Sequence, residues 1–178
     1  AIVRDNELED SANEGDEISV VLDITPFYAE SGGQVADTGR IIGEGFELDV
    51  KDCKKVTGER FAHICNVISG EIKVGDSCIA EIDSGRRMAT ARNHSTTHLL
   101  HKALRKYLGT HVEQAGSYVT PERLRFDFTH FKAMTKEELD RIEKEVNEAI
   151  LASYEVITKE TSIDEAKKLG AMALFGEK

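Results

Sequence analysis

Three histidines follow one another at helical spacing near the middle of this chain. His94 and His98 are four residues apart, and His101 follows three residues later. A helix advances about 100° per residue, so these three side chains are expected on one face. Two imidazoles four residues apart can bind one metal ion, because this spacing brings their ring nitrogens together. A metalloprotease needs glutamate directly after the first histidine, and Ser95 stands there, so the pattern does not support that chemistry.

The spacing alone leaves two readings of the histidines open. One is a metal site, and the other is a set of surface histidines or of core histidines with satisfied hydrogen bonds. Both readings require a helix, which the sequence predicts over residues 88–108 and ends at Gly109. Its apolar positions recur at helical spacing and are Leu99, Leu100, Ala103, Leu104 and Leu108.

The rest of the second half alternates between strand and helix patterns. We expect a hairpin of residues 111–119 and 123–130, then a strand over 154–161. Capping boxes that begin at Thr135 and Ser162 predict two helices, the first to about Ser153 and the second ending at Gly170. Residues 88–178 therefore read as an α+β domain.

The first half reads as an all-β unit. Short β-branched or alternating runs predict strands at residues 17–24, 46–50, 61–68 and 77–82, with glycines between them. Such even spacing is typical of a small barrel or sandwich. We predict an α+β chain with a small β-barrel at residues 1–87 followed by the second domain at 88–178.

Charge and composition limit the classes of partner. The 178 residues carry a net charge of −10, distributed as −12 over residues 1–85, +6 over 86–132 and −4 over 133–178. An acidic protein is a poor nonspecific binder of nucleic acid, so we expect no DNA partner, but the basic stretch can face an anion. The sequence shows no evident protein partner.

The sequence also carries information on location. No apolar run approaches the ~20 residues that cross a bilayer, and the acidic N-terminus is unlike a signal peptide. Cys53, Cys65 and Cys78 fit no disulfide or metal spacing and are expected to be reduced. We therefore expect a cytoplasmic location and no membrane partner. The absence of an initiator Met indicates a piece excised from a longer protein.

Several segments together resemble the editing domain of alanyl-tRNA synthetases and of the related free-standing editing proteins. The resemblance covers nearly the whole chain in order. It rests on residues 91–101 (ARNHSTTHLLH), 108–117 (LGTHVEQAGS), 26–39 (PFYAESGGQVADTG), 124–128 (LRFDF) and 173–178 (ALFGEK).

The resemblance implies an enzyme of protein biosynthesis. It implies an editing module that hydrolyses Ser-tRNA(Ala) or Gly-tRNA(Ala) at the acceptor end of the tRNA, within an ATP-dependent alanine–tRNA ligase. The family binds zinc with a His-x-x-x-His pair, which His94 and His98 match, and with a Cys-x-x-x-His pair that this chain does not contain. The zinc site is therefore expected to be incomplete, and the ATP and Mg²⁺ sites belong to an aminoacylation domain that is also absent here.

The resemblance assigns further site residues by position. Thr97 and Gln114 match positions in the family's editing pocket. Apart from that resemblance, Gly32-Gly33-Gln34 matches the tripeptide of release factors, which also act on a tRNA ester; this makes the three residues weak candidates for tRNA binding, although a glycine turn is the simpler explanation. Phosphate binding is expected, more weakly, from Arg86, Arg87, Arg92 and Lys102.

Two alternative functions remain open at this point. One is a free-standing hydrolase that edits mischarged tRNA in trans, and such a protein should contain the Cys-x-x-x-His pair. The other is a noncatalytic tRNA-binding module in which the histidines are structural.

Overall fold

The computed structural model describes residues 1–58 and 60–170, in two compact units. The first unit contains residues 1–94 and 118–124, and the second contains residues 95–117 and the described residues from 125 on. The resembling segment at 173–178 lies outside the described residues. Within the described part of the chain, every helix is too short or too polar to cross a membrane.

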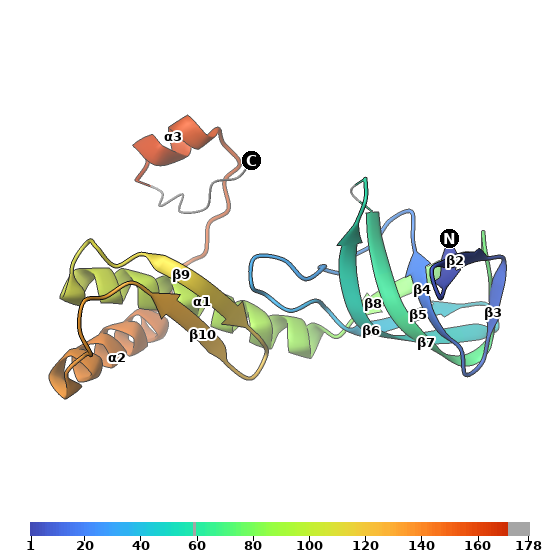
Figure 1. The fold of residues 1–178 in the computed structure, drawn as a ribbon, viewed down its shortest axis with the longest axis horizontal. Coiled ribbons are helices and arrows are strands. Elements are labelled where there is room, and N and C mark those ends of the chain that lie inside the picture. The colour runs from blue at the N-terminus through green and yellow to red at the C-terminus, as the bar shows by residue number, and fades with distance from the viewer. Residues whose placement is uncertain (59, 171–178) are drawn as a thin grey trace. The chain divides into compact units, whose positions relative to one another are not determined.

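The first unit is an antiparallel sheet of eight strands (Figure 1). The strands are β1 (Ile2–Arg4), β2 (Glu7–Glu9), β3 (Ser11–Asn13), β4 (Glu17–Val21), β5 (Gly39–Gly43), β6 (Phe46–Val56), β7 (Arg60–Lys73) and β8 (Cys78–Ile82). Their order is β2-β1-β4-β7-β6-β5-β8, and β3 also pairs with β7.

This sheet corrects the prediction of a closed barrel. Among the described residues, the sequence of paired strands has two ends, at β2 and β8. The edge strand β2 has three residues, and its Glu7 and Glu9 are charged. Short, charged strands are a common way to stop pairing at a sheet edge, which explains why the ladder ends there.

The long strands β6 and β7 contribute much of the core of the first unit. Alternate residues Phe46, Leu48 and Val50 of β6 are buried, as the period of a strand requires. The register with β7 then shifts between Val50 and Asp52, and Cys53 beyond the shift is buried as well. Such a bulge bends the strand while both of its halves still face the core.

His63 on β7 is a buried histidine whose two ring nitrogens both have partners. Its side chain is 0% exposed; Nδ1 lies 2.8 Å from the Val20 carbonyl oxygen and Nε2 lies 2.7 Å from Thr25 Oγ1. Its ring packs edge-on against Phe27, at 5.2 Å between centroids. Burial lowers the pKa of His63 from 6.5, and the hydrogen bond to Val20 offsets only part of this effect.

We expect the stability of the chain to fall as the pH is lowered below about 6.5. The unfolded chain binds a proton at His63 in this range while the folded chain does not, so protonation favours unfolding. Above the unfolded pKa the contribution of His63 is fully present. Urea unfolding at pH 7.5 and pH 5.5 measures the difference. In His63→Gln the difference should shrink, and an unchanged difference would contradict this account.

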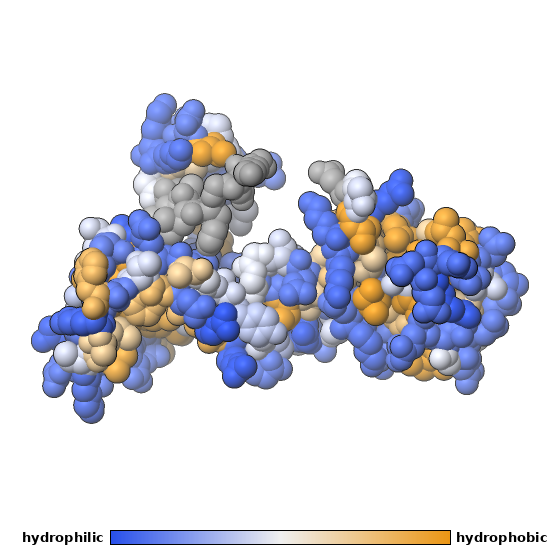
Figure 2. Space-filling view, viewed as in Figure 1, coloured by the Kyte–Doolittle hydropathy of each residue, from blue (hydrophilic) through white to orange (hydrophobic). Residues whose placement is uncertain are grey.

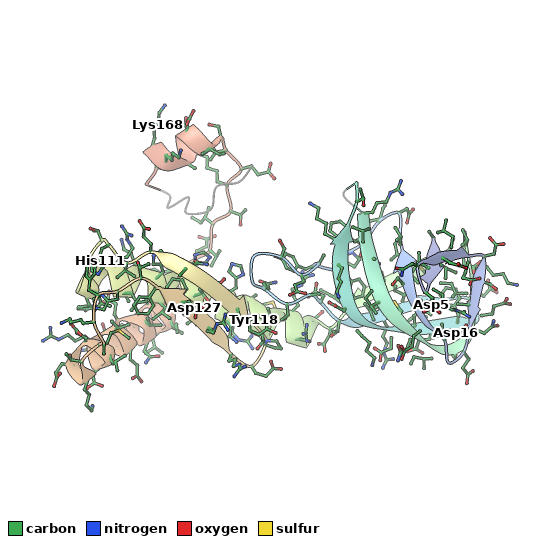
Figure 3. All side chains as sticks on the ribbon, in the orientation of Figure 1. Asp5, Asp16, His111, Tyr118, Asp127 and Lys168 are labelled. Carbon is green, nitrogen blue, oxygen red and sulfur yellow. The ribbon has the colours of Figure 1, made fainter. Side chains whose placement is uncertain are left out.

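The second unit combines helices with a two-stranded hairpin. Helix α1 (Ser84–Leu108) begins in the first unit, and β9 (Gln114–Val119) and β10 (Leu124–Phe128) form the hairpin. Figure 3 labels Tyr118 on β9 and Asp127 on β10. The core of this unit contains Ala103, Leu104, Val112 and Ile142.

The remaining two helices begin directly after the predicted cap residues, Thr135 and Ser162. Thr135 caps α2 (Lys136–Leu151). Its side chain accepts a hydrogen bond from the Glu138 backbone N–H, and the Glu138 carboxylate accepts one from the Thr135 backbone N–H. Ser162 accepts from the Glu165 N–H at the start of α3 (Ile163–Lys168). The strand predicted at 154–161 is wrong, because this segment has no strand pairing in the structure. Its apolar Tyr154, Val156 and Ile157 are exposed.

The surface is mainly polar, with separate apolar patches. Hydrophilic residues cover much of the visible face of each unit (Figure 2). Among the exposed apolar side chains of the first unit are Leu8 and Ile79, at 79% and 65% exposure. Phe27 is buried at 3%, while the neighbouring Tyr28 is 36% exposed.

Candidate functional site

The glycine-rich loop, residues 25–38, contains a tight turn that presents Gln34. Ser31 and Gln34 exchange backbone hydrogen bonds of 3.3 and 2.9 Å across Gly32 and Gly33. Both glycines have positive φ, 57° and 80°, a conformation that side chains with a Cβ rarely adopt. The simple reading of this tripeptide as a glycine turn is therefore correct.

The same loop pairs with the end of β9, inside the first unit. Gln34 forms a parallel bridge with Val119, and the Val119 N–H donates to the Gly33 carbonyl at 2.7 Å. The Val35 N–H donates to the Val119 carbonyl at 3.1 Å. The backbone of Gln34 is thus held independently of its side chain.

Gln34 contacts His94, the first of the predicted metal ligands. The amide oxygen Oε1 lies 2.6 Å from His94 Nδ1, although the two residues are 60 positions apart. The next residue before the histidine, Asn93, donates from Nδ2 to the carbonyl oxygens of Thr120 and Pro121 at 2.8 and 3.2 Å. Side chains from adjacent positions of α1 therefore connect it to the glycine-rich loop and to the hairpin turn.

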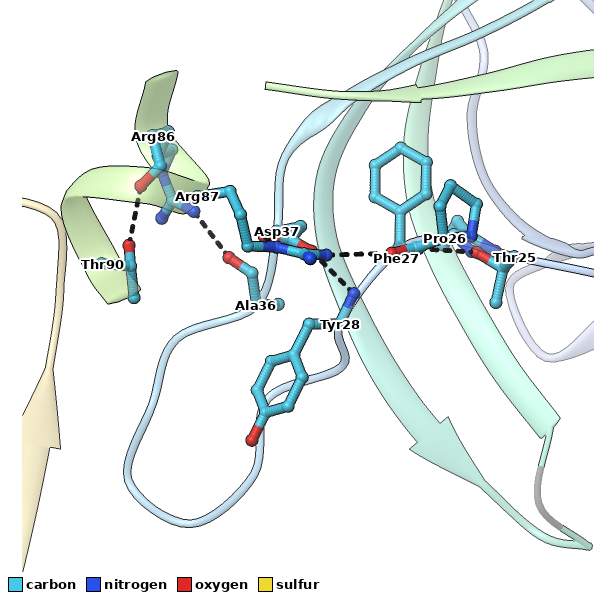
Figure 4. Close-up of polar contacts among 10 residues, drawn as sticks. Thr25, Pro26, Phe27, Tyr28, Ala36, Asp37, Arg86, Arg87 and Thr90 are labelled. Atoms are coloured by element: carbon cyan, nitrogen blue, oxygen red, sulfur yellow. Dashed lines mark hydrogen bonds and ion pairs between the residues drawn. The ribbon is translucent and has the colours of Figure 1, made fainter. Parts of the chain in front are cut away.

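Two arginines at the start of α1 hold the base of the loop (Figure 4). Arg87 Nε donates to both carboxylate oxygens of Asp37, at 2.8 and 2.9 Å, and the pair also forms a closer ionic contact. The Tyr28 N–H donates to the same carboxylate at 2.7 Å. Arg86 donates to the Ala36 carbonyl at 2.6 Å. The hydrogen bond to Asp37 raises the pKa of Arg87.

These contacts give Arg86 and Arg87 structural partners within the chain. Their predicted role in binding tRNA stays a prediction, as does that of Arg92 and Lys102, whose side chains are exposed on α1. Asp37 was not identified from the sequence. In the sequence, Asp37 is marked only by its place in the segment 26–39 that resembles the editing domain. In the structure, Asp37 is buried, with 4% exposure.

The remaining predicted site residues lie in the second unit. On α1, Thr97 is buried at 7% exposure and His98 is exposed, while Gln114 at the start of β9 is half buried. His101 is a core histidine: it is 4% exposed, Nε2 lies 3.4 Å from the Val112 carbonyl, and its ring packs 5.2 Å from Phe126. His101 and His98 therefore differ in their surroundings, because His101 is buried in the core and His98 is exposed.

A second histidine pair was not predicted. His111 Nε2 lies 2.9 Å from His130 Nδ1, and the rings are nearly parallel at 16°. Figure 3 labels His111 ahead of β9. The backbone beside this pair joins the two strands, since Thr129 donates from N to the Glu113 carbonyl at 3.0 Å. The contact between His111 and His130 therefore joins the segment before β9 to the segment after β10.

The donor set limits what metal this chain can hold. Within the described residues, no group of three or more His, Cys, Asp or Glu side chains is placed to hold a metal ion. The three cysteines are free, as expected. Burial raises the pKa of Cys53 to about 11 and that of Cys65 to about 12, so both thiols stay protonated at neutral pH. The role of His94 and His98 as zinc ligands stays a prediction.

Part of the chain is similar to a known protein family. Residues 1–86 match the family described as tRNA synthetases class II (A).

The individual relatives are alanine–tRNA ligases. The chain is 57% identical over 177 residues to the alanine–tRNA ligase of Acetivibrio thermocellus, which covers 99% of this chain and 20% of the relative. It is 55% identical to the alanine–tRNA ligase of Clostridioides difficile and 51% identical to that of Carboxydothermus hydrogenoformans, in each case over 100% of this chain and 20% of the relative. The chain's homologues are thus ligases, a class of enzyme, and it spans about one fifth of their length.

Proposed function

We propose that this chain is a segment of an alanine–tRNA ligase and contributes the site that hydrolyses Ser-tRNA(Ala) and Gly-tRNA(Ala). One observation carries the proposal: within a sequence homologous throughout to alanine–tRNA ligases, Gln34 of the glycine-rich loop binds His94 of the predicted His-x-x-x-His pair. Two motifs of the editing resemblance, far apart in sequence, thus meet at one contact.

The chemistry explains why a ligase would need such a site. A pocket that accepts alanine cannot exclude glycine by size, and it rejects serine poorly because serine adds only one hydroxyl. Differences of this kind are worth about 1–3 kcal/mol. A second site that hydrolyses the wrong ester removes the remaining errors. That site must recognise the serine hydroxyl, which requires polar side chains.

Thr97 and Gln114 are the residues we assign to this recognition. Both offer hydrogen-bonding atoms and both are at least half buried, so they can supply polar contacts that a serine hydroxyl matches and an alanine methyl does not. His94 and His98 would orient the ester or hold the metal beside it. Arg92 and Lys102, with the clustered Arg86 and Arg87, are proposed to meet the phosphates near the acceptor end of tRNA(Ala).

The other parts of the ligase activity are proposed to lie outside this chain. ATP and Mg²⁺ serve the aminoacylation reaction, and no residue of this chain is assigned to them. We divide the chain functionally into residues 1–87, which support the glycine-rich loop, and 88–178, which carry the editing residues, and we propose a cytoplasmic location.

We expect zinc to bind this chain weakly and to leave its stability unchanged. His94 and His98 fit a metal as two imidazoles at helical spacing, and when bound the ion would polarise the ester carbonyl or a water. Within the described residues no further side chain is placed to complete the site, so solvent would supply the other ligands, whereas both hydrophobic cores form without the ion. A chelator should therefore leave the melting temperature unchanged within error. Stoichiometric zinc that survives dialysis, or a melt that collapses with chelator, would contradict this.

The proposed function is tested by the double variant His94→Ala/His98→Ala in the full-length ligase. We expect hydrolysis of Ser-tRNA(Ala) to fall by about 100-fold or more, while the charging of tRNA(Ala) with alanine stays within about twofold because that site lies elsewhere. Unchanged hydrolysis would place editing outside this helix and would favour a tRNA-binding role. Hydrolysis by the isolated chain at the rate of the ligase would instead favour a free-standing editor.

A further inference from the structure

We infer that Asp37 is a positioning residue that fixes where the tip of the glycine-rich loop lies along helix α1. Its carboxylate ties the base of the loop to Arg87, while the tip carries Gln34, which contacts His94 further along the same helix. All of these residues lie in the first unit. Only the catalytic consequence of this placement rests on the proposed function.

Asp37 holds the two stems of the loop against each other. The Tyr28 N–H donates to the Asp37 carboxylate at 2.7 Å, and the Asp37 N–H donates to the Tyr28 carbonyl at 3.0 Å. The Asp37 side chain is 6% exposed, so water competes little for these hydrogen bonds. Both stems therefore meet at one buried carboxylate.

Arg87 joins this closed base to α1 (Figure 4). Its Nε donates to both carboxylate oxygens of Asp37, and its Nη2 donates to the Pro26 carbonyl at 2.9 Å. One guanidinium thus contacts both stems of the loop. Because its N–H donors lie in one plane, the guanidinium fixes the orientation of the base as well as its distance from the helix.

The loop has little freedom between its two attachment points on α1. Arg87 and His94 are seven residues apart on this helix, so they lie about 20° apart on one face and about 10.5 Å apart along the axis. Three residue steps of the loop, from Gln34 to Asp37, reach about 10–11 Å when fully extended. Because the reach of the loop is similar to the span on the helix, a shift of Asp37 along α1 should move Gln34 with it.

Main-chain hydrogen bonds to Val119 report where the tip lies. The Val119 N–H donates to the Gly33 carbonyl at 2.7 Å, and the Val35 N–H donates to the Val119 carbonyl at 3.1 Å. Both bonds must lengthen if the tip moves away from β9. The Val119 amide is the better probe, since it is distant in sequence from Asp37.

Placement of this kind matters because reaction rates depend steeply on geometry. A displacement of about 1 Å can lower the rate of a catalysed reaction by about 100-fold. His94 is proposed to orient the ester or to hold a metal beside it, and Gln34 is the loop residue that contacts His94. Asp37 acts on this contact through the loop, which makes it a positioning residue rather than a catalytic one.

The amide spectrum of the ¹⁵N-labelled chain tests the placement without any reaction. Asp37→Asn keeps an acceptor for the Tyr28 N–H but removes the charge that holds Arg87. We expect the Val119 amide proton to shift upfield, as its hydrogen bond lengthens, and we expect the same direction in Arg87→Gln. The reference is the Val67 amide, which donates to the Asp16 carbonyl at 2.9 Å in the same unit and should keep its position.

These signals come from the folded chain, so a lower stability alone does not move them. An unchanged Val119 amide in both variants would overturn the inference. A shift at Val67 as large as that at Val119 would also overturn it, because the change would then extend through the sheet.

Kinetics of the full-length ligase then test the positioning role, at a temperature where circular dichroism shows each variant to be folded. Asp37→Asn should lower kcat for hydrolysis of Ser-tRNA(Ala) by about 10- to 100-fold and leave KM within about twofold. Asp140→Asn, which removes the charge of an exposed ion pair on α2, is the matched control and should keep wild-type kinetics.

The split between kcat and KM separates positioning from tRNA binding. A raised KM with unchanged kcat would mean that the ion pair serves a tRNA contact, and it would overturn the positioning role. Wild-type kcat and KM in Asp37→Asn would overturn it as well. A wild-type ligase that does not hydrolyse Ser-tRNA(Ala) would instead overturn the proposed function, and the Val119 amide would still decide the placement.

Discussion

Replacing Gln114 with tryptophan in the full-length ligase is expected to lower kcat/KM for hydrolysis of Ser-tRNA(Ala) by about 100-fold or more. Gln114 begins β9 and is half buried, so its amide can meet a small polar substrate group without full exposure to water. Tryptophan removes that amide and fills the space with a large ring. Single-turnover deacylation of purified Ser-tRNA(Ala) measures the effect.

Ala115→Trp is the matched control for this prediction. Ala115 is the next residue of β9 and is exposed, and successive side chains of a strand point to opposite faces. The same bulk placed there should change hydrolysis by less than about threefold. A Gln114→Trp enzyme that hydrolyses Ser-tRNA(Ala) as fast as the wild type would remove Gln114 from the site. Equal losses in both variants would show that bulk on this strand disturbs the hairpin instead.

Asp37→Ala is expected to destabilise the chain by about 3–5 kcal/mol. The Asp37 side chain is 6% exposed and accepts hydrogen bonds from Arg87 and from the Tyr28 backbone N–H. Its removal leaves the Arg87 guanidinium, which is 32% exposed, without its carboxylate, and it releases the base of the glycine-rich loop. Urea unfolding followed by circular dichroism gives the change in free energy of unfolding.

A surface ion pair provides the comparison for Asp37. Lys136 and Asp140 are paired one turn apart on α2, with side chains 81% and 60% exposed. Asp140→Ala should cost at most about 0.5 kcal/mol, because water screens the pair. Asp37→Asn keeps an acceptor for the Tyr28 N–H, so its loss of stability should lie between those of Asp37→Ala and Asp140→Ala. If Asp37→Ala and Asp140→Ala cost the same, the buried ion pair does not organise the loop.

Local patterns were sufficient to predict the helices. The capping boxes at Thr135 and Ser162 identified the starts of α2 and α3, because a cap depends on residues only three positions apart. Helix α1 begins four residues before the predicted Met88. The missed signal was Asp83, whose side chain accepts from the Arg86 N–H at 2.9 Å and so caps the first turn.

Strands with few residues or distant partners were not predictable in the same way. β1, β2 and β3 have three residues each, too few for an alternating pattern to stand out, and β5 is identified by its pairing with β6 and β8. The predicted strand at 154–161 had the right residues, but strand residues need a partner to satisfy their backbone groups.

The candidate site was predictable in its residue types but not in its contacts. The spacing of His94 and His98 placed both on one helix, which the structure confirms. Their different surroundings, with His94 bound to Gln34 and His98 exposed, depend on contacts made far away in sequence. The Arg87–Asp37 pair likewise spans 50 residues. No local pattern specifies which of several arginines will meet which carboxylate.

The most direct test of the proposed editing role is the selectivity of deacylation. Full-length ligase carrying this sequence is mixed with Ser-tRNA(Ala) or with correctly charged Ala-tRNA(Ala), without ATP or free amino acid, and the loss of each ester is followed in time. We predict that the serine ester is cleaved about 100-fold faster or more than the alanine ester, since only serine offers a hydroxyl to the polar pocket. Cleavage of both esters at equal rates, or loss of Ser-tRNA(Ala) no faster than in buffer, would contradict the account.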